Sequence, residues 1–389
     1  MSSFARIVLP IALVSVAMLG CSSHKAGGAL LTERTGTQAD FGNAATAGAD
    51  LATSKGDLTG VKTAKHVGIT LEQRDTASSP ATAKAVAESL APEVACGIGL
   101  CDSDAALAAA PVFTKAGKPF MVIGATDPRL PERCGKGTYL ACFGDDAQAE
   151  AIARFAAGGF GKRCVVVTDS MYDYTRSLTN YFRGSFEREG GSVVAQLDRR
   201  GVSFKSELAA LKARAEAAGV NFVFVASEPD GLSELLGAIR EAMPSQPIIG
   251  GDGLDCAAVT TSGSAPSDRV YFATHGWFGK GASADAEAFA KAYAAANGTP
   301  PPNAFAALGY DAVMLVQVAA RRAGGVENPN SAALVKAIGE IRNYHGATGE
   351  ISYGNGPVPR KDVWIVAVMR GERELAKRMP PGATPPPKK

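Results

Sequence analysis

The feature that most constrains the fold of this chain is a regular alternation of short apolar runs with helical segments, from residue 29 to residue 369. Runs such as Arg163–Thr168 (RCVVVT), Asn221–Ala226 (NFVFVA) and Val270–Thr274 (VYFAT) have the length and β-branched content of buried strands. A further strand is expected over residues 67–71. Strands that alternate with helices in this way predict parallel, doubly wound α/β sheets. With 389 residues, the chain is long enough for two such domains.

The composition and the motifs argue against several classes of function. Hydrophobic residues make up 46% and charged residues 20%, with a net charge of +2 and no basic block before the last two lysines, so no nucleic-acid partner is expected. No GxSxG, HExxH or P-loop motif occurs, and Asp102 stands where a dinucleotide fingerprint after Gly97 needs its third glycine. The histidines are scattered and no CxxC is present. We therefore expect no enzyme, no metal and no cofactor.

The first 21 residues have the pattern of an export signal. Arg6 supplies the positive charge, Ile7–Met18 the apolar run, and Leu19-Gly20-Cys21 an exit that resembles a lipobox. Lipid attachment at Cys21 would anchor the mature protein to a membrane face, with residues 22–28 as a tether. We expect a lipid-anchored protein of the periplasm or cell surface. A plain signal peptide cut near Gly20 and a retained membrane helix are the alternatives, although the run is short for a span.

Six cysteines lie beyond this segment, and export permits disulfides among them. Cys134 and Cys142 bracket the Gly-containing reversal GKGTYLA and are the predicted pair. Closing so short a loop would contribute roughly 2–3 kcal/mol. A Cys96–Cys101 disulfide is also possible, although its geometry would be tight. The cysteines at positions 164 and 256 could be buried free thiols.

Small and polar residues follow two neighbouring strands, predicted over 94–99 and 120–123. In an open parallel sheet, ligands bind beyond the carboxyl ends of the strands, where helix N-termini offer free N–H groups. The two loops therefore predict a cradle for a small molecule. Its candidate residues are Asp102, Ser103, Gly124, Ala125 and Thr126. The alternative is that Asp102 and Ser103 only cap the following helix, predicted over 105–114.

Taken in order, these segments resemble the Leu/Ile/Val-type solute receptors of ABC transporters. The order and spacing of motifs over residues 29–375 carry this likeness, rather than any single motif. The matching stretches are Cys101-Asp102-Ser103, Ala108–Pro111, Ile123–Leu130, the DSMYDY loop that ends at Tyr174, the long apolar helix Ala304–Ala323, and His345–Tyr353.

The resemblance implies a type I periplasmic binding fold: two Rossmann-like lobes joined by three hinge crossovers that close on a ligand. Lobe 1 would comprise residues 29–147 and 276–350, lobe 2 residues 148–275 and 351–375, and residues 376–389 a disordered Pro-rich tail. The implied function is capture of a small molecule by a monomer and its delivery to the permease subunits of an ABC importer. An amino acid or related metabolite is the expected ligand. A ligand-sensing receptor with the same clamp is the alternative, as is a carrier of a cationic, hydroxylated or apolar ligand.

The resemblance also assigns ligand-binding positions. Thr126 matches a threonine that binds the ligand carboxylate, with Gly124 and Ala125 offering backbone groups. Asp252 matches the acid that faces the ligand ammonium group. Phe41 and Tyr174 stand at aromatic positions of the family. For Phe41, simple packing under the first helix is the alternative.

Acidic residues mark the departures from the family pattern. Asp102 replaces a family serine, and an anion beside a ligand carboxylate is unfavourable unless it is protonated or turned away. Either Ser103 takes over and Asp102 is a cap, or the ligand is not an ordinary amino acid. Glu228 lies near a family aromatic position. Together, Asp102, Glu228 and Asp252 make the predicted cleft acidic, which suits a cationic or hydroxyl-rich ligand. Alternatively, two of these three acids cap solvent-facing turns. His275, at a strand end, is a weaker candidate for ligand contact.

Overall fold

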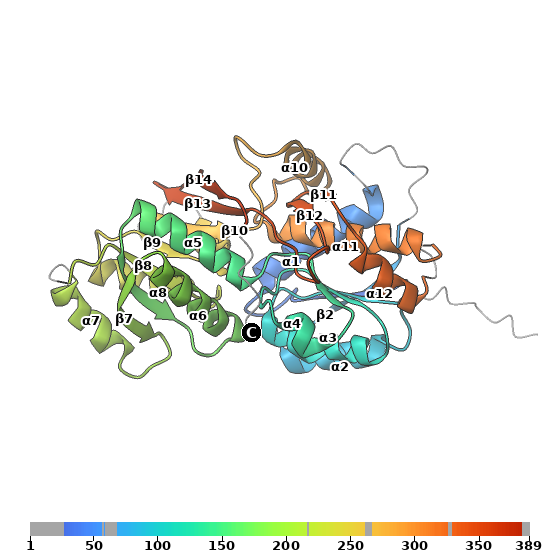
Figure 1. Ribbon diagram of the computed structural model, residues 1–389, viewed down its shortest axis with the longest axis horizontal. Helices are drawn as coiled ribbons and strands as arrows, with labels where there is room; N and C mark the ends of the chain where they lie inside the picture. Colours follow the sequence, from blue (N-terminus) through green and yellow to red (C-terminus); the bar gives the residue numbers. More distant parts are fainter. Residues whose placement is uncertain are drawn as a thin grey trace, which may run out of the picture.

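The computed structural model describes residues 27–56, 58, 68–215, 218–260, 267–325 and 329–382. The export signal with Cys21 and most of the tether therefore lie outside the described residues. The described helices and strands form two α/β lobes that lie side by side (Figure 1). This architecture confirms the predicted fold class of two Rossmann-like lobes. Among the described helices, none is both long and apolar enough to cross a membrane.

The first lobe is built around a five-stranded parallel sheet of order β2-β1-β3-β4-β5. Its strands are β1 (Gly28–Thr32), β2 (Leu71–Asp75), β3 (Gly97–Gly99), β4 (Phe120–Val122) and β5 (Thr138–Leu140). Its helices are α1 (Ala39–Lys55), α2 (Pro80–Leu90), α3 (Ser103–Lys115), α4 (Leu130–Cys134), α10 (Ala284–Asn297), α11 (Phe305–Arg322) and α12 (Ser331–Gly339). A short hairpin, β11 (Tyr344–Gly346) and β12 (Gly349–Ile351), contacts α10.

The second lobe is built around a seven-stranded sheet of order β14-β13-β10-β9-β8-β6-β7. The strands from β10 to β7 pair in parallel, whereas β13 and β14 join one edge as antiparallel strands. The strands are β6 (Arg163–Thr168), β7 (Ser192–Asp198), β8 (Phe222–Ala226), β9 (Ile248–Gly250), β10 (Val270–Thr274), β13 (Val363–Met369) and β14 (Glu372–Met379). The helices are α5 (Asp145–Gly159), α6 (Asp173–Arg188), α7 (Phe204–Arg214), α8 (Leu232–Ala242), η1 (Asp252–Leu254) and α9 (Ala257–Thr260).

The chain passes between the two sheets three times: between β5 and β6, after β10, and between β12 and β13. Lys361 in the third passage is buried and donates to the backbone oxygen of Ala141 in the first passage, at 3.0 Å, and to the hydroxyl of Thr348. Thr348 in turn donates to Asp311 of α11, which also accepts from the backbone N–H of Ala347 at 2.7 Å. Burial lowers the pKa of Lys361 to about 8 and raises the pKa of Asp311. This buried cluster ties two passages to lobe 1.

Helices α1 and α11 pack closely because each carries a glycine at the crossing. A Cβ atom on Gly48 would lie 1.8 Å from the backbone oxygen of Ala306, and one on Gly309 would lie 2.0 Å from that of Ala45. Neither position can hold a side chain without moving a helix. The close approach of α1 and α11 also accompanies the stacking of Phe41 on Phe305, whose ring centroids are 4.0 Å apart.

Two edge strands lie where the sequence did not predict them. A strand was expected over residues 67–71, but β2 starts at Leu71, because this partly exposed edge strand (LEQRD) lacks the apolar run used to locate strands. The predicted disordered tail from residue 376 is also wrong for its first residues. The charged segment ERELAKRM forms β14, which pairs with β13 after a turn in which both Arg370 and Gly371 have positive φ. Residues 383–389 lie outside the described part of the chain.

The predicted disulfide is not formed, since Cys134 and Cys142 are both free thiols. The Cys134 Sγ lies 3.8 Å from the backbone oxygen of Ala106 in α3, and the Cys142 Sγ lies 3.4 Å from that of Ala125. The segment between the two cysteines is not a tight reversal. It contains β5, and an extended strand moves the chain on by about 3.3 Å per residue. The alternative Cys96–Cys101 bond is absent as well, and the thiols at positions 164 and 256 are buried and free.

Candidate functional site

Loops from both sheets meet around a small cavity between the lobes. Nine residues line it: Phe41, Cys101, Gly124, Thr126, Tyr174, Glu228, Asp252, Gly253 and Phe305. Six of these were predicted to bind ligand, and they come from loops at the carboxyl ends of strands or from the starts of helices. The cavity leaves only ≈ 10 Å³ for the centre of a water molecule, which is about what one water needs. A larger ligand therefore requires the lobes to separate or the lining side chains to move.

Asp252 is the centre of a hydrogen-bond network on the side of lobe 2. Its Oδ1 accepts from the hydroxyl of Tyr174 at 2.9 Å and from Nε2 of Gln148 at 3.0 Å, and its Oδ2 lies 2.9 Å from Nε2 of His275. The Tyr174 hydroxyl accepts in turn from the backbone N–H of Gly253 at 3.0 Å. A carboxylate has about four acceptor positions, so these three donors leave one on Oδ2. Asp252 is therefore held rigidly and can still accept one hydrogen bond from a ligand.

His275 is the partner that fixes the second oxygen of Asp252. Its ring is fully buried and lies against Phe143, with ring centroids 3.8 Å apart. Burial lowers the pKa of His275, which favours the neutral ring that donates through Nε2. Its Nδ1 atom has no hydrogen-bond partner among the described residues. His275 thus orients Asp252 and does not line the cavity itself.

Thr126 faces the same cavity from lobe 1, beyond the end of β4. Its hydroxyl oxygen lies 3.5 Å from Nε2 of Gln148, and its backbone oxygen accepts from the N–H of Asp145 at 2.7 Å. The neighbouring backbone N–H of Gly124 already donates to the oxygen of Leu100 at 3.0 Å. The N–H of Gly124, which was predicted to bind a ligand, is therefore not free. The side chain of Gln148 therefore bridges Thr126 and Asp252, since its Nε2 contacts an oxygen of each.

The start of α3 is occupied by carboxylates of the chain itself. Asp102 caps the helix, since its Oδ1 accepts from the N–H of Asp104 at 2.6 Å and of Ala105 at 3.1 Å. Glu33, which directly follows β1, accepts from the N–H of Cys101 at 3.0 Å and of Asp102 at 3.2 Å. Two N–H groups of the loop before α3 and two of its first turn are thus satisfied internally. Asp102 lies beside the cavity without lining it, as one of the two sequence interpretations expected.

Ser103 is the alternative hydroxyl in this loop. It is also absent from the cavity lining, and its Oγ is buried without a hydrogen-bond partner among the described residues. The pair predicted from the first loop therefore contributes no lining side chain, whereas the neighbouring Cys101 does.

Three buried acids at or beside the cavity have raised pKa values. Burial and the nearby Asp102 raise the pKa of Glu33 to about 8, and burial raises that of Asp102 to about 6. Burial and Asp102 also raise the pKa of Glu228, which follows β8 and lines the cavity, well above its usual range. None of the nine lining residues is basic.

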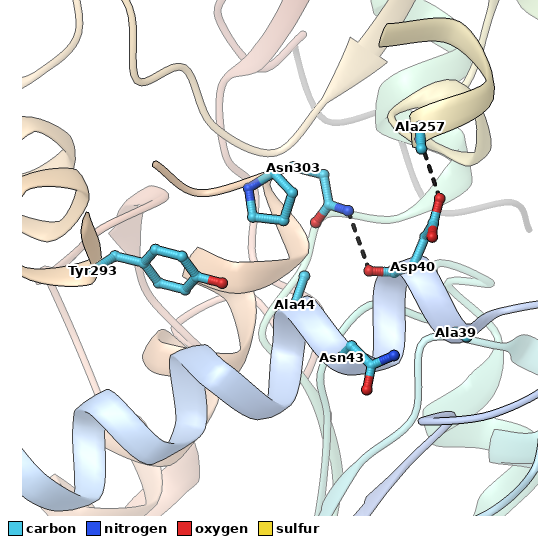
Figure 2. Close-up of a pocket in the computed structure, with 8 residues that line it drawn as sticks. Ala39, Asp40, Asn43, Ala44, Ala257, Tyr293 and Asn303 are labelled. Carbon is cyan, nitrogen blue, oxygen red and sulfur yellow. Dashed lines mark hydrogen bonds between the residues drawn. The ribbon is translucent and has the colours of Figure 1, made fainter. Parts of the chain in front are cut away.

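The lobes also touch outside the cavity. Arg133 of lobe 1 forms an ion pair with Asp173 of α6, whose backbone N–H donates to Asp104 at 3.0 Å. Elsewhere, the N–H of Ala257 in α9 donates to the carboxylate of Asp40 in α1 at 3.1 Å (Figure 2). The hollow drawn there measures ≈ 350 Å³, but Asp40 is exposed and no buried charge lines it. These contacts hold the two lobes together around the cavity.

Several residues of the site were not identified from the sequence. Cys101, Gly253 and Phe305 line the cavity, and Gln148 positions Asp252. In the sequence, nothing about these four residues indicates that they lie at a ligand site. Glu33 could have been found, because it is a charged residue directly after a buried strand. Within the described residues, no group of three or more His, Cys, Asp or Glu is arranged to hold a metal ion.

Comparison with known proteins extends the likeness over most of the chain. The Leu/Ile/Val-binding protein BraC3 of Rhizobium johnstonii is 25% identical over 331 residues, which is 84% of this chain and 86% of the relative. The crystal structure of the leucine-binding protein LivK from Thermotoga maritima is 25% identical, with a TM-score of 0.78 over 91% of this chain and 98% of that one. A solute-binding protein of R. palustris in complex with benzoate has the same fold, with a TM-score of 0.75, 22% identity, and coverage of 91% of this chain and 96% of that one.

The family comparison gives the same answer and confirms the resemblance found in the sequence. Residues 29–372 match the family model for periplasmic binding proteins. This range includes every strand from β2 to β13 and all nine residues that line the cavity. The protein belongs to the periplasmic binding protein family.

Proposed function

We propose that this protein captures a small metabolite with an ammonium group between its lobes and delivers it to the transmembrane subunits of an ABC importer. One observation carries the proposal: Thr126 from lobe 1 and Asp252 from lobe 2 line one cavity, and Asp252 keeps an acceptor position for a ligand. The names of BraC3 and LivK, a Leu/Ile/Val-binding and a leucine-binding protein, support a ligand of amino-acid size. The role consists of binding and release, without catalysis.

Replacing either gripping residue should weaken ligand binding. A hydrogen bond to a charged group contributes about 1.5–3 kcal/mol, so Thr126→Ala and Asp252→Ala should each lower affinity roughly tenfold or more. Because both contacts are complete only when the lobes close, the double variant should lose less than the sum of the single losses. A thermal-shift screen of amino acids, amides and amines finds the ligand, and isothermal titration calorimetry measures the affinities.

The exposed Thr299 and Glu241 provide matched controls, and their alanine variants should bind as the wild type does. Asp252→Asn separates charge from shape: it should weaken a ligand that is cationic at this end far more than a neutral one. Unchanged affinity in both Thr126→Ala and Asp252→Ala would show that the ligand binds elsewhere.

We propose further that the protein acts as a monomer outside the cytoplasm and is anchored by a lipid on Cys21. The lipobox-like sequence Leu19-Gly20-Cys21 supports the anchor. Cys21→Ser should release the protein from membranes into the soluble fraction and abolish labelling by a fatty-acid analogue. Ser22→Ala is the control and should stay anchored. If Cys21→Ser remained in the membrane fraction, the segment would be a retained helix.

A further inference from the structure

We infer that the ligand of the central cavity is an organic ammonium ion without a carboxylate, such as an alkylamine, and not an amino acid. The inference rests on the proposed function, because it concerns the same cavity, and it names the chemical class of the ligand. Three features carry it: the occupied start of α3, the lining of the cavity, and the absence of a counter-charge for a ligand anion among the lining residues.

The first feature is that the chain supplies its own carboxylates at the start of α3. The free N–H groups of a helix start are the usual means of binding a carboxylate. Here Glu33 takes the N–H groups of Cys101 and Asp102, and Asp102 takes those of Asp104 and Ala105. A ligand carboxylate near this loop would meet two buried acids and none of these four donors.

The second feature is the chemistry of the cavity wall. Its polar side chains include two carboxyl groups, Glu228 and Asp252, both at least nine-tenths buried, and Asp252 has an unused acceptor position. Its apolar part includes the stacked rings of Phe41 and Phe305. Asp252 and the aromatic rings suit an organic cation, since an ammonium group is attracted to the unused acceptor position of Asp252 and to the faces of rings. A bound cation would also favour ionisation of Glu228, whose pKa is raised by burial.

The third feature is that the cavity wall holds no counter-charge for a ligand anion. Glu228 and Asp252 offer acceptors to an ammonium group, whereas no Lys or Arg is among the nine lining residues to hold an anion.

Leucine and 3-methylbutylamine test this inference, because they share one side chain and differ only in the carboxylate. We expect titration calorimetry of the wild-type protein at pH 7 to give at least about tenfold tighter binding of the amine, since only leucine carries a carboxylate, and Glu33 and Asp102 already occupy the N–H donors that would hold it. The pair phenylalanine and 2-phenylethylamine should show the same order if the cavity accepts an aromatic side chain.

Two variants probe the cause. One variant is Asp102→Ser, and the other is the more conservative Glu33→Gln, which keeps an acceptor oxygen. Each should strengthen leucine binding and so reduce the preference for the amine over leucine. Glu132→Gln, at an exposed acid of α4, is the control and should leave the preference unchanged. Circular dichroism and the thermal midpoint establish that each variant is folded.

The possible results are distinct. Binding of leucine as tight as or tighter than that of the amine would overturn the inference, while the proposed function would stand if Asp252→Ala weakened leucine binding. Absence of binding by every amine tested would also overturn it. A preference for the amine that persists unchanged in both variants would remove Glu33 and Asp102 as its cause and overturn the argument from the start of α3.

Discussion

Replacing Gly309 by alanine should lower the free energy of unfolding by about 3 kcal/mol or more, the upper range for an overpacked core. The added Cβ would lie 2.0 Å from the backbone oxygen of Ala45, so α1 and α11 must move apart. Their separation would also disturb the stack of Phe41 on Phe305 at the cavity. Urea denaturation followed by circular dichroism measures the loss.

A matched control is available in α8. Gly237 is also in a helix, but a Cβ there would meet nothing within 4 Å. Gly237→Ala should therefore stabilise the protein by about 0.4–1 kcal/mol, because alanine restricts the unfolded chain more than glycine does. Equal effects of the two substitutions would contradict the assignment of Gly309 as a contact between helices.

Asp311→Ala should lower the free energy of unfolding by about 3–5 kcal/mol, the range for removing one partner of a buried charged pair. The change removes the acceptor of the Ala347 and Thr348 N–H groups and leaves the buried Lys361 ammonium without its counter-charge. Since Lys361 belongs to the third passage and bonds to the first, the hinge itself should loosen. Chemical denaturation gives the stability, and limited proteolysis should show faster cutting near residues 352–362.

Adding Lys361→Met to Asp311→Ala should recover part of this loss, because the double variant no longer buries an unpaired charge. Glu350→Ala, at an exposed acid of β12, is the control and should change the free energy of unfolding by at most about 0.5 kcal/mol. If the double variant were as unstable as the sum of the two single variants, Asp311 and Lys361 would act independently of each other.

Much of the fold was predictable because buried segments are apolar, and this can be seen locally in the sequence. Strands that lie inside a sheet, such as β6 and β10, have both faces covered and are written as continuous apolar runs, so their bounds were predicted to the residue. The edge strands β2 and β14 have exposed side chains and carry no such run, and there the predictions of a shifted strand and of a disordered tail were wrong. The cysteine pair failed for a related reason, since spacing in the chain does not show that β5 lies between the two thiols.

The sequence by itself determined the two-lobed α/β architecture and the polar loops that end its strands, because both depend on hydrophobic periodicity and on local capping. Only the tertiary structure decided which loop residues face the cavity. It placed Glu33, which follows a different strand, on the N–H groups of Cys101 and Asp102, and it joined Asp252 to Gln148, Tyr174 and His275. These contacts link segments that are remote in the chain. No local pattern encodes them, and they set the charge that a ligand meets.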